Sequence, residues 1–176
     1  MKHYFQPYIN DARIFIETGS ANGEGITAAL NSGFPAIHSI ELSAHYYDMC
    51  ERFFKEHPQV HLYLGESKKV LMMLLPQINE RCVFWLDAHW CGGKTAGEGS
   101  PIPIMEELKV IASHHIKDHI ILIDDMRLLR EKTEKEWSDV PYCVCDLEEF
   151  IHTINPAYKI TYEFGVVEDD ILVARV

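Results

Sequence analysis

Carboxylates and other polar side chains follow five short apolar runs of this sequence. In chain order, these strand-end groups are Glu17-Thr18-Gly19, Glu41, Gly65-Glu66-Ser67, Asp87-Ala88-His89-Trp90 and Asp124-Asp125. Short apolar runs that stop at a turn signal are typical of buried strands. Parallel strands place their carboxyl ends at one edge of a sheet, and ligands bind outside that edge. The spacing therefore predicts a ligand-binding site built from the strand-end groups.

Three aspartates and one histidine at this edge could do chemistry. Asp87, Asp124 and Asp125 would converge from the ends of the fourth and fifth strands, and such a carboxylate set suits Mg²⁺ or a similar hard cation. The metal ion would lower the pKa of a substrate hydroxyl. His89 could instead remove the proton as a general base. In a third interpretation, Asp87 and Asp124 only cap loop amides. The candidate catalytic residues are Asp87, His89 and Asp124.

A glycine-rich stretch, residues 17–25, lies between the first strand and the first helix. Gly19, Gly23 and Gly25 permit a tight turn and a close approach of the backbone to a ligand. Glu41 ends the second strand, where an acidic residue binds ribose hydroxyls in nucleotide-binding βαβ units. Alternatively, these residues are an ordinary glycine turn and a surface glutamate. Together they favour a nucleotide-like cofactor.

A second stretch, residues 88–95, looks like a phosphate-binding P-loop in which Ala88 replaces the first glycine. The run 119–125 looks like the acidic strand that holds magnesium in nucleotide triphosphatases. A working P-loop opens directly into a helix, whereas the glycines and prolines of residues 97–103 cannot sustain one. We therefore interpret this stretch as a loop of the active site, and a triphosphatase that depends on Lys94 is the rival enzyme hypothesis.

Apolar runs alternate with helical patterns through most of the chain. The expected strands cover residues 13–17, 38–42, 60–65, 82–87 and 119–124, and a hairpin joins residues 159–164 to 171–176. Ser43 and Ser67 are the expected N-caps of two helices, and Asp146 and Glu149 form a capping box that opens another. The pattern predicts one α/β domain over residues 1–176. Its doubly wound, mostly parallel sheet would carry helices on both faces.

Several motifs in this order carry a resemblance to a known family. They are Glu17-x-Gly19-x-x-x-Gly23-x-Gly25, then SIEL, LGES, WLDAHW and LIDD, and finally the hairpin. Over essentially its whole length, the sequence resembles the class I S-adenosylmethionine-dependent methyltransferases, which are Rossmann-like proteins. The resemblance implies seven strands in the order 3-2-1-4-5-7-6, with strand seven antiparallel.

The same resemblance implies which residues bind the cofactor. They are Glu17, Gly19, Ser20, Ala21, Gly23, Glu41, Leu42, Gly65, Glu66, Ser67 and Asp87. By this resemblance the glycine-rich stretch would face the methionine part, and Glu41 would hold both ribose hydroxyls. Glu66 and Ser67 would meet the adenine, and Asp87 would lie nearest the transferred methyl group. Ala21 replaces a common glycine, which is compatible with a negative φ at that residue.

The resemblance implies a methyltransferase that uses S-adenosylmethionine, and we expect it to act on an oxygen atom of a small-molecule acceptor. The set Asp87, Asp124 and Asp125 resembles that of metal-dependent O-methyltransferases, so Mg²⁺ is a candidate second cofactor. Residues 91–103 and a charged, irregular excursion over residues 126–141 would wall the acceptor site. A cofactor-binding module without catalysis is the alternative from another class. A homo-oligomer partner could supply a lid.

Composition narrows the partners and the compartment. The 176 residues carry a formal net charge of −11, which repels nucleic-acid phosphates, and no apolar stretch reaches the ~20 residues of a membrane span. With no signal peptide and five cysteines, the expectation is a reduced, cytoplasmic protein. Cys143 and Cys145 are expected on an extended segment, and His114, His115 and His119 at a solvated helix end.

Overall fold

A seven-stranded mixed sheet forms the centre of the computed structural model, which describes residues 4–88, 102–132 and 135–176. The strands are β1 (Ile14–Thr18), β2 (Ala36–Glu41), β3 (Val60–Leu64), β4 (Cys82–Leu86), β5 (Ile120–Ile123), β6 (Lys159–Glu163) and β7 (Ile171–Arg175). The α-helices of the described ranges are α1 (Glu24–Ser32), α2 (Ala44–Phe54), α3 (Ser67–Leu74), α4 (Ile104–Ser113), α5 (Met126–Glu131), α6 (Lys135–Ser138) and α7 (Val144–Ile154). Two 3-10 helices are η1 (Gln6–Tyr8) and η2 (Leu75–Gln77).

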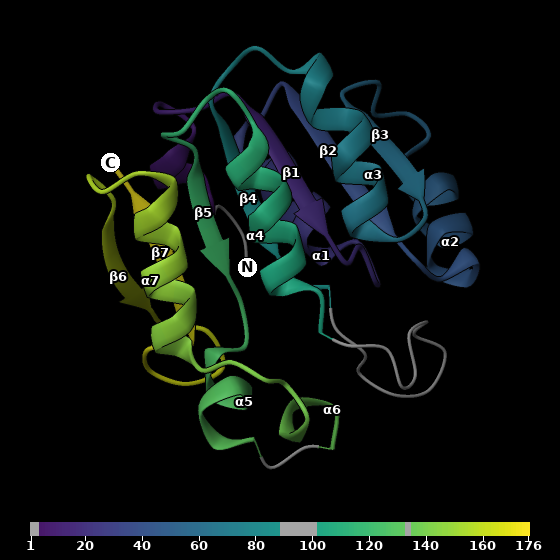
Figure 1. Cartoon of the computed structure of the whole chain (residues 1–176). Helices are drawn as coiled ribbons and strands as arrows, with labels where there is room; N and C mark the ends of the chain where they lie inside the picture. Colours follow the sequence, from purple (N-terminus) through teal and green to yellow (C-terminus); the bar gives the residue numbers. More distant parts are fainter. Residues whose placement is uncertain (1–3, 89–101, 133–134) are drawn as a thin grey trace.

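The strand order is β3-β2-β1-β4-β5-β7-β6, which confirms the predicted order (Figure 1). Strands β1 to β5 pair in parallel, and β7 is antiparallel to both of its neighbours. The final hairpin is also confirmed, with β6 and β7 in register from Lys159 opposite Arg175 to Glu163 opposite Ile171. This register closes one end of the sheet with β6, while β3 is the other edge.

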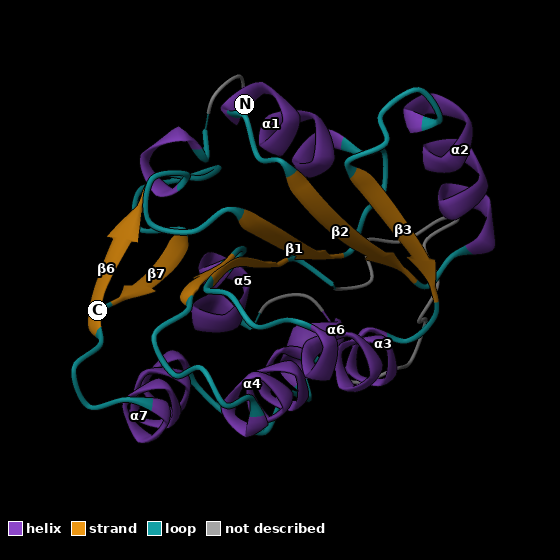
Figure 2. Cartoon of the chain, turned by 90° about the horizontal axis from the view of Figure 1, so that it is seen from above, coloured by secondary structure: helices purple, strands orange, loops and turns teal. Residues whose placement is uncertain are grey.

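Helices cover both faces of the sheet, as predicted (Figure 2). Helices α3, α4 and α7 lie on one face, and α1 and α2 lie on the other. Side chains alternate between the two sides of β1, so that Ile16 packs in the core under α3, α4 and α7 while Phe15 packs under α1 and α2. None of the helices in the described ranges is long and apolar enough to cross a membrane.

Strands β4 and β5 are buried at every residue, because they lie in the middle of the sheet with helices on both sides. Their sequences are accordingly apolar throughout, which is why the sequence revealed them. The edge strand β3 is half-exposed instead, and it includes His61 and Tyr63. A strand in the middle of the sheet is therefore easier to recognise from its apolar sequence than a strand at the edge.

Helix α7 corrects two predictions. It begins at Val144 with Cys143 as its N-cap, whereas Asp146 was predicted as the first capping residue. Asp146 is the third helical residue and completes a capping box with Cys143. Cys143 and Cys145 therefore do not lie on an extended segment, and a disulfide joins them, so the expectation of reduced cysteines is wrong for this pair.

The predicted excursion over residues 126–141 is more ordered than expected. It contains α5 and α6, and Figure 1 shows both beyond the arrowhead of β5, at the carboxyl edge of the sheet. Met126, Leu129 and Trp137 are buried in the core of this region. These three apolar side chains are far apart in a charged stretch, so the sequence lacks the hydrophobic periodicity that predicts a helix.

The histidines after α4 do not lie at a solvated helix end. His114 and His119 are 5 % and 0 % exposed, and only His115 of the three is exposed. The Nδ1 atom of His119 accepts a hydrogen bond from the backbone N–H of Cys82, so its Nε2–H donates to Nδ1 of His114. Nε2–H of His114 then donates to the carbonyl of Ile78. The chain of bonds needs both rings neutral, and burial lowers the pKa of His119 to about 4.

Candidate functional site

Backbone hydrogen bonds continue the sheet past its last residues and hold the strand-end groups at one edge. They run from Gly65 N to Glu41 O (2.8 Å), Gly19 N to Ile40 O (2.9 Å), Asp87 N to Thr18 O (3.1 Å) and Asp124 N to Leu86 O (3.1 Å). The structure therefore brings together the described strand-end groups, as the sequence predicted. His89 and Trp90 lie outside the described residues.

The glycine-rich stretch needs its glycines because backbone and carboxylate pack against them. Gly19 has a φ of +86°, and a Cβ there would lie 2.4 Å from the carbonyl oxygen of Asp87. Gly23 has a φ of +76° and is the N-cap of α1. A Cβ on Gly25 would lie 1.8 Å from Oε1 of Glu17. The stretch is thus fitted closely to β1 and to the end of β4.

Ala21 lies in the same turn with a φ of +40°, so the negative φ that would readily accommodate an alanine in place of the common glycine is not found. A Cβ in the left-handed region costs roughly 1–2 kcal/mol. The backbone N–H of Ala21 donates to Oε2 of Glu41 at 2.9 Å, and this bond orients the strained residue.

Glu41 joins the end of β2 to the glycine-rich stretch. Besides the bond from Ala21, its Oε1 accepts a hydrogen bond from the backbone N–H of Ser43 at 2.7 Å. The side chain is 7 % exposed. Each carboxylate oxygen has two lone pairs, so Glu41 keeps acceptor capacity for two ligand hydroxyls.

Glu17 lies beneath the stretch and is only 1 % exposed. Its Oε2 accepts a hydrogen bond from the hydroxyl of Ser39, which is itself bonded to the hydroxyl of Ser20 at 2.6 Å. Burial raises the pKa of Glu17 to about 8. The hydrogen bond from Ser39 lowers this pKa, and the nearby carboxylates of Asp87 and Glu41 raise it by smaller amounts. Glu17 is therefore a buried carboxyl group that packs under the glycine-rich stretch and supports it.

The residues predicted to meet the adenine lie at the start of α3. Ser67 is the first helical residue and is buried, whereas Glu66 is the N-cap, so the predicted N-cap was one residue off. Glu66 is exposed and forms an ion pair with Lys69 at 2.6 Å. Leu42, after β2, is 46 % exposed. An exposed apolar side chain at this edge can pack against a planar ring such as adenine.

Glu107 of α4 was missed by the sequence reasoning. It is fully buried near the hydroxyls of Thr18 and Ser67, which lower the pKa of its carboxyl, but burial outweighs them and raises that pKa to about 7. Neither of its oxygens has a partner of good hydrogen-bond geometry in the described part of the chain, nor has the Thr18 hydroxyl. Its signal in the sequence was one acidic residue at an inward position of an amphipathic helix.

The predicted metal set is rearranged. The carboxylates that lie within 4.8 Å of one another among the described residues are Asp124, Asp125 and Asp170, so Asp170 takes the place expected for Asp87. The Nη1 atom of Arg127 forms ion pairs with Asp125 and, at 2.5 Å, with Asp170. Asp170 also accepts backbone bonds from Arg127 and Val166. A cation already serves two of the three carboxylates, so the set fits Mg²⁺ poorly.

Asp124 is the half-buried carboxylate of this group. Its Oδ1 accepts a hydrogen bond from the backbone N–H of Asp125 at 2.8 Å. Burial, followed by repulsion from Asp125, raises the pKa of Asp124 to about 6. A carboxyl with that pKa is ionised at neutral pH and can still accept a proton readily.

Comparisons with known proteins found similar structures but no similar sequences. No protein-family model matches the chain. No curated protein sequence matches it either. The solved structure of an O-methyltransferase from Bacillus cereus in complex with SAH has a TM-score of 0.62 at 16 % identity, covering 99 % of this chain and 80 % of that one. The SAH-bound methyltransferase PaMTH1 of Podospora anserina gives 0.64 at 16 % identity, covering 98 % and 75 %.

A third structure is TomG, an O-methyltransferase from Streptomyces achromogenes in complex with SAM. It has a TM-score of 0.61 at 15 % identity and covers 99 % of this chain and 78 % of that one. Together with the strand order and the antiparallel β7, these likenesses decide the architecture. The chain has the class I methyltransferase fold.

The class I methyltransferase fold accounts for the glycine-rich stretch, which occupies the first βα turn of the sheet. The rival P-loop motif lies almost wholly outside the described residues, Lys94 included. The first described helix after β4 begins only at Ile104. Trp85 of β4 is buried against Tyr4 and Phe5.

Proposed function

We propose that the protein is an S-adenosylmethionine-dependent methyltransferase that acts on a hydroxyl group of a small molecule. The observation that carries the proposal is Glu41, whose carboxylate joins the end of β2 to the glycine-rich stretch in a class I methyltransferase fold. Solved structures with this fold hold SAH or SAM. Those ligands carry a ribose, which is what a carboxylate at the end of β2 binds.

The described residues fit this cofactor. Glu41 would hold the ribose hydroxyls, and the backbone of the stretch from Gly19 to Gly23 would face the methionine part. Leu42 would pack on the adenine, with Glu66 and Ser67 at its edge. Asp87 would lie nearest the methyl group. These residues are polar and acidic, and negative charge at the site would also favour the positively charged sulfonium of the cofactor.

Asp124 would act as the base. The bound cofactor supplies an electrophilic methyl group, so the protein has to align the acceptor and remove its proton. Asp124 would take the hydroxyl proton as the hydroxyl oxygen forms its bond to carbon and the sulfur keeps the electron pair of the broken bond. Asp87 and His89 would orient the acceptor. The proposed mechanism does not use Mg²⁺, because Asp125 and Asp170 already form ion pairs with Arg127.

The first test is calorimetric titration of the protein with S-adenosylmethionine and S-adenosylhomocysteine. We expect Glu41→Gln to weaken both affinities by roughly tenfold to a hundredfold, because hydrogen bonds to a charged group contribute about 1.5–3 kcal/mol. The control is Glu149→Gln, which removes the same charge from an exposed residue of α7, away from the strand ends. Equal affinities for the wild-type protein and Glu41→Gln would remove the ribose assignment, and ATP binding that Lys94→Ala abolishes would favour the triphosphatase.

Catalysis is tested with Asp124→Asn and a panel of phenols and catechols as acceptors. We expect methyl transfer to fall by roughly 10²–10⁴-fold while affinity for S-adenosylhomocysteine stays within about twofold, because only the proton acceptor is lost. The matched control is Asp48→Asn on the exposed face of α2. Undiminished transfer in Asp124→Asn would move the base to another residue.

A further inference from the structure

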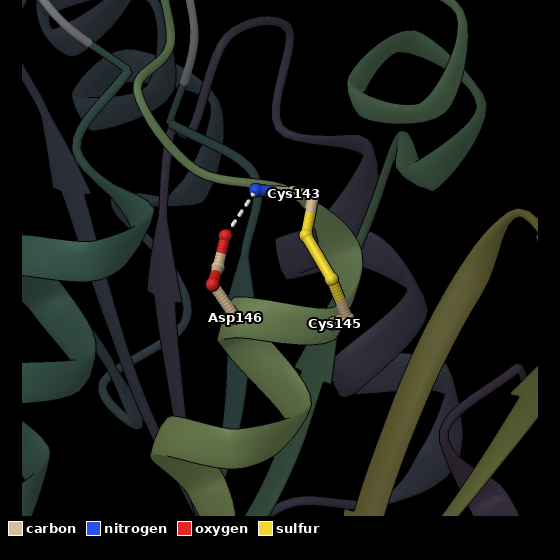
Figure 3. A group of neighbouring side chains, drawn as sticks. All are labelled: Cys143, Cys145 and Asp146. Atoms are coloured by element: carbon tan, nitrogen blue, oxygen red, sulfur yellow. Dashed lines mark hydrogen bonds between the residues drawn. A yellow bond between two sulfur atoms is a disulfide. The ribbon is translucent and has the colours of Figure 1, made fainter.

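A disulfide between Cys143 and Cys145 lies at the N-terminus of α7 (Figure 3). Cys145 is exposed and Cys143 is half-buried. Cys50 and Cys82, the free cysteines of the described part of the chain, are buried, and burial raises the pKa of each thiol to about 12. Among the described residues, the accessible cysteine sulfurs are therefore those of this pair.

The two sulfurs have different surroundings. Cys143 is the N-cap of α7, and its Sγ accepts a hydrogen bond from the backbone N–H of Asp146. Unpaired N–H groups and the dipole at a helix N-terminus stabilise a thiolate. Cys145 is the second residue of the helix and is exposed. When the bond breaks, Cys143 is the better leaving sulfur and Cys145 the more accessible target.

Charged groups near the pair are already partnered. The carboxylate of Asp146 lies within 4.8 Å of both sulfurs and opposes a thiolate, but its Oδ2 is held by the backbone N–H of Cys143 at 2.7 Å. Glu148, on the same helix, accepts a bond from the Tyr162 hydroxyl of β6 at 2.5 Å. After α5, Lys132 donates to the carbonyl of Val140 at 2.7 Å. Asp146 is therefore the charged residue whose substitution should change the pKa of the Cys143 thiol in the reduced pair.

The pair is separate from the residues proposed for methyl transfer. Helix α7 starts beside α5 and α6 at the carboxyl edge of the sheet (Figure 1). The preceding residue, Tyr142, donates its hydroxyl to the carbonyl of Ile102 at 3.2 Å. No strand-end group in the described part of the chain takes part in the capping box. Chemistry at the sulfurs can therefore be measured without any assay of methyl transfer.

We propose that Cys143 and Cys145 are a thiol–disulfide exchange site that accepts two electrons from a dithiol. One thiolate of the dithiol attacks Sγ of Cys145, the S–S bond breaks, and its electron pair goes to Sγ of Cys143. The second sulfur of the dithiol attacks the mixed disulfide, releases Cys145 and leaves as a cyclic disulfide. The two protons of the dithiol end on the protein thiols or in solvent.

The experiment uses the full chain with Cys91→Ser as background, so that the described cysteines alone are followed. The native, oxidised protein is treated with dithiothreitol and then iodoacetamide, and labels are counted by mass. We expect two labels, on Cys143 and Cys145, with an unchanged far-ultraviolet circular dichroism spectrum. Reduction that requires denaturant, or that unfolds the chain, would make the bond a structural crosslink and overturn the proposal.

Single-cysteine variants then separate the two sulfurs. Cys145→Ser retains Cys143, and Cys143→Ser places another good N-cap residue at the start of α7, so both are expected to fold. We expect the pH midpoint of alkylation to be lower for Cys143 than for Cys145 by about one unit or more. Asp146→Asn should lower the Cys143 midpoint further. Equal midpoints, or a lower one for Cys145, would contradict the assigned roles.

Discussion

At the scale of single residues, Gly25 has the least room for a side chain among the described glycines. A Cβ on Gly25 would lie 1.8 Å from Oε1 of Glu17, and the Glu17 side chain is buried and bonded to Ser39. We therefore expect Gly25→Ala to lower the free energy of unfolding by about 1–3 kcal/mol and to weaken cofactor binding, because the loop has to shift. Urea denaturation and calorimetric titration measure the two effects.

A double-mutant cycle separates this clash from a general effect on α1. Glu17→Ala removes the atom that a new Cβ would meet, so Gly25→Ala should cost much less stability in that background than in the wild-type protein. Gly33→Ala, after the same helix, has open space around the Cβ but a φ of +92°, so it measures the cost of a left-handed backbone without a clash. Additive losses in the cycle would show that the helix, and not the carboxylate, requires Gly25.

Residues whose role follows from chain position were accessible to sequence reasoning. Gly19 and Glu41 stand at strand ends, and an edge of parallel strands gathers such residues whatever their side chains. The positive φ of Ala21 was not accessible, because it depends on a bond to Glu41 from another strand. Glu107 was missed for a similar reason, since its burial against Thr18 and Ser67 is a tertiary feature.

At the scale of elements, the hydrogen-bonded histidines join four segments. The bonds of His119 and His114 run from β4, through the start of β5 and the end of α4, to the residue after η2. We expect His119→Leu to lower the free energy of unfolding by roughly 2–4 kcal/mol, because the Cys82 N–H and the Nδ1 atom of His114 lose their partner in the core. Chemical denaturation measures the change.

His115→Leu is the control for that element. It alters an exposed histidine between the two bonded ones, so we expect a change within about 0.5 kcal/mol. A loss as large as that of His119→Leu would mean that the whole turn, rather than the bonded rings, is sensitive to substitution. Cofactor binding should be unaffected in both variants, because these bonds do not involve the strand-end groups.

Elements were predictable where one local signal dominates. The central strands are apolar at every residue, and Gly33 ends α1 as its C-cap. The start of α7 was misplaced because Asp146 looks like a capping residue, while a cysteine is not among the usual N-cap types. Helices α5 and α6 are six and four residues long, too short for a periodic pattern, and tertiary packing of Trp137 holds them.

At the scale of the whole molecule, buried titratable groups of opposite kinds set the dependence of stability on pH. Glu17 and Glu107 have pKa values raised to about 8 and about 7 from 4.5, so their contribution is complete below pH 4.5 and is lost as pH rises through 7 and 8. His119 has a pKa lowered to about 4 from 6.5, so its contribution is lost as pH falls through 4. Stability should therefore be greatest on the acidic side of neutrality.

The expected fall between pH 6 and pH 8 is on the order of 2–3 kcal/mol, since each unit of pKa shift corresponds to about 1.4 kcal/mol. Differential scanning calorimetry over pH 4–9 measures it in the protein without cofactor. Glu107→Gln cannot ionise, so its stability should fall less over this interval than that of the wild-type protein, while the exposed Glu149→Gln should follow the wild-type curve. A wild-type stability that rises from pH 6 to pH 8 would mean that both buried glutamates are ionised in the folded protein. The acidic strand-end edge would then need a compensating cation, which the sulfonium of the proposed cofactor could provide.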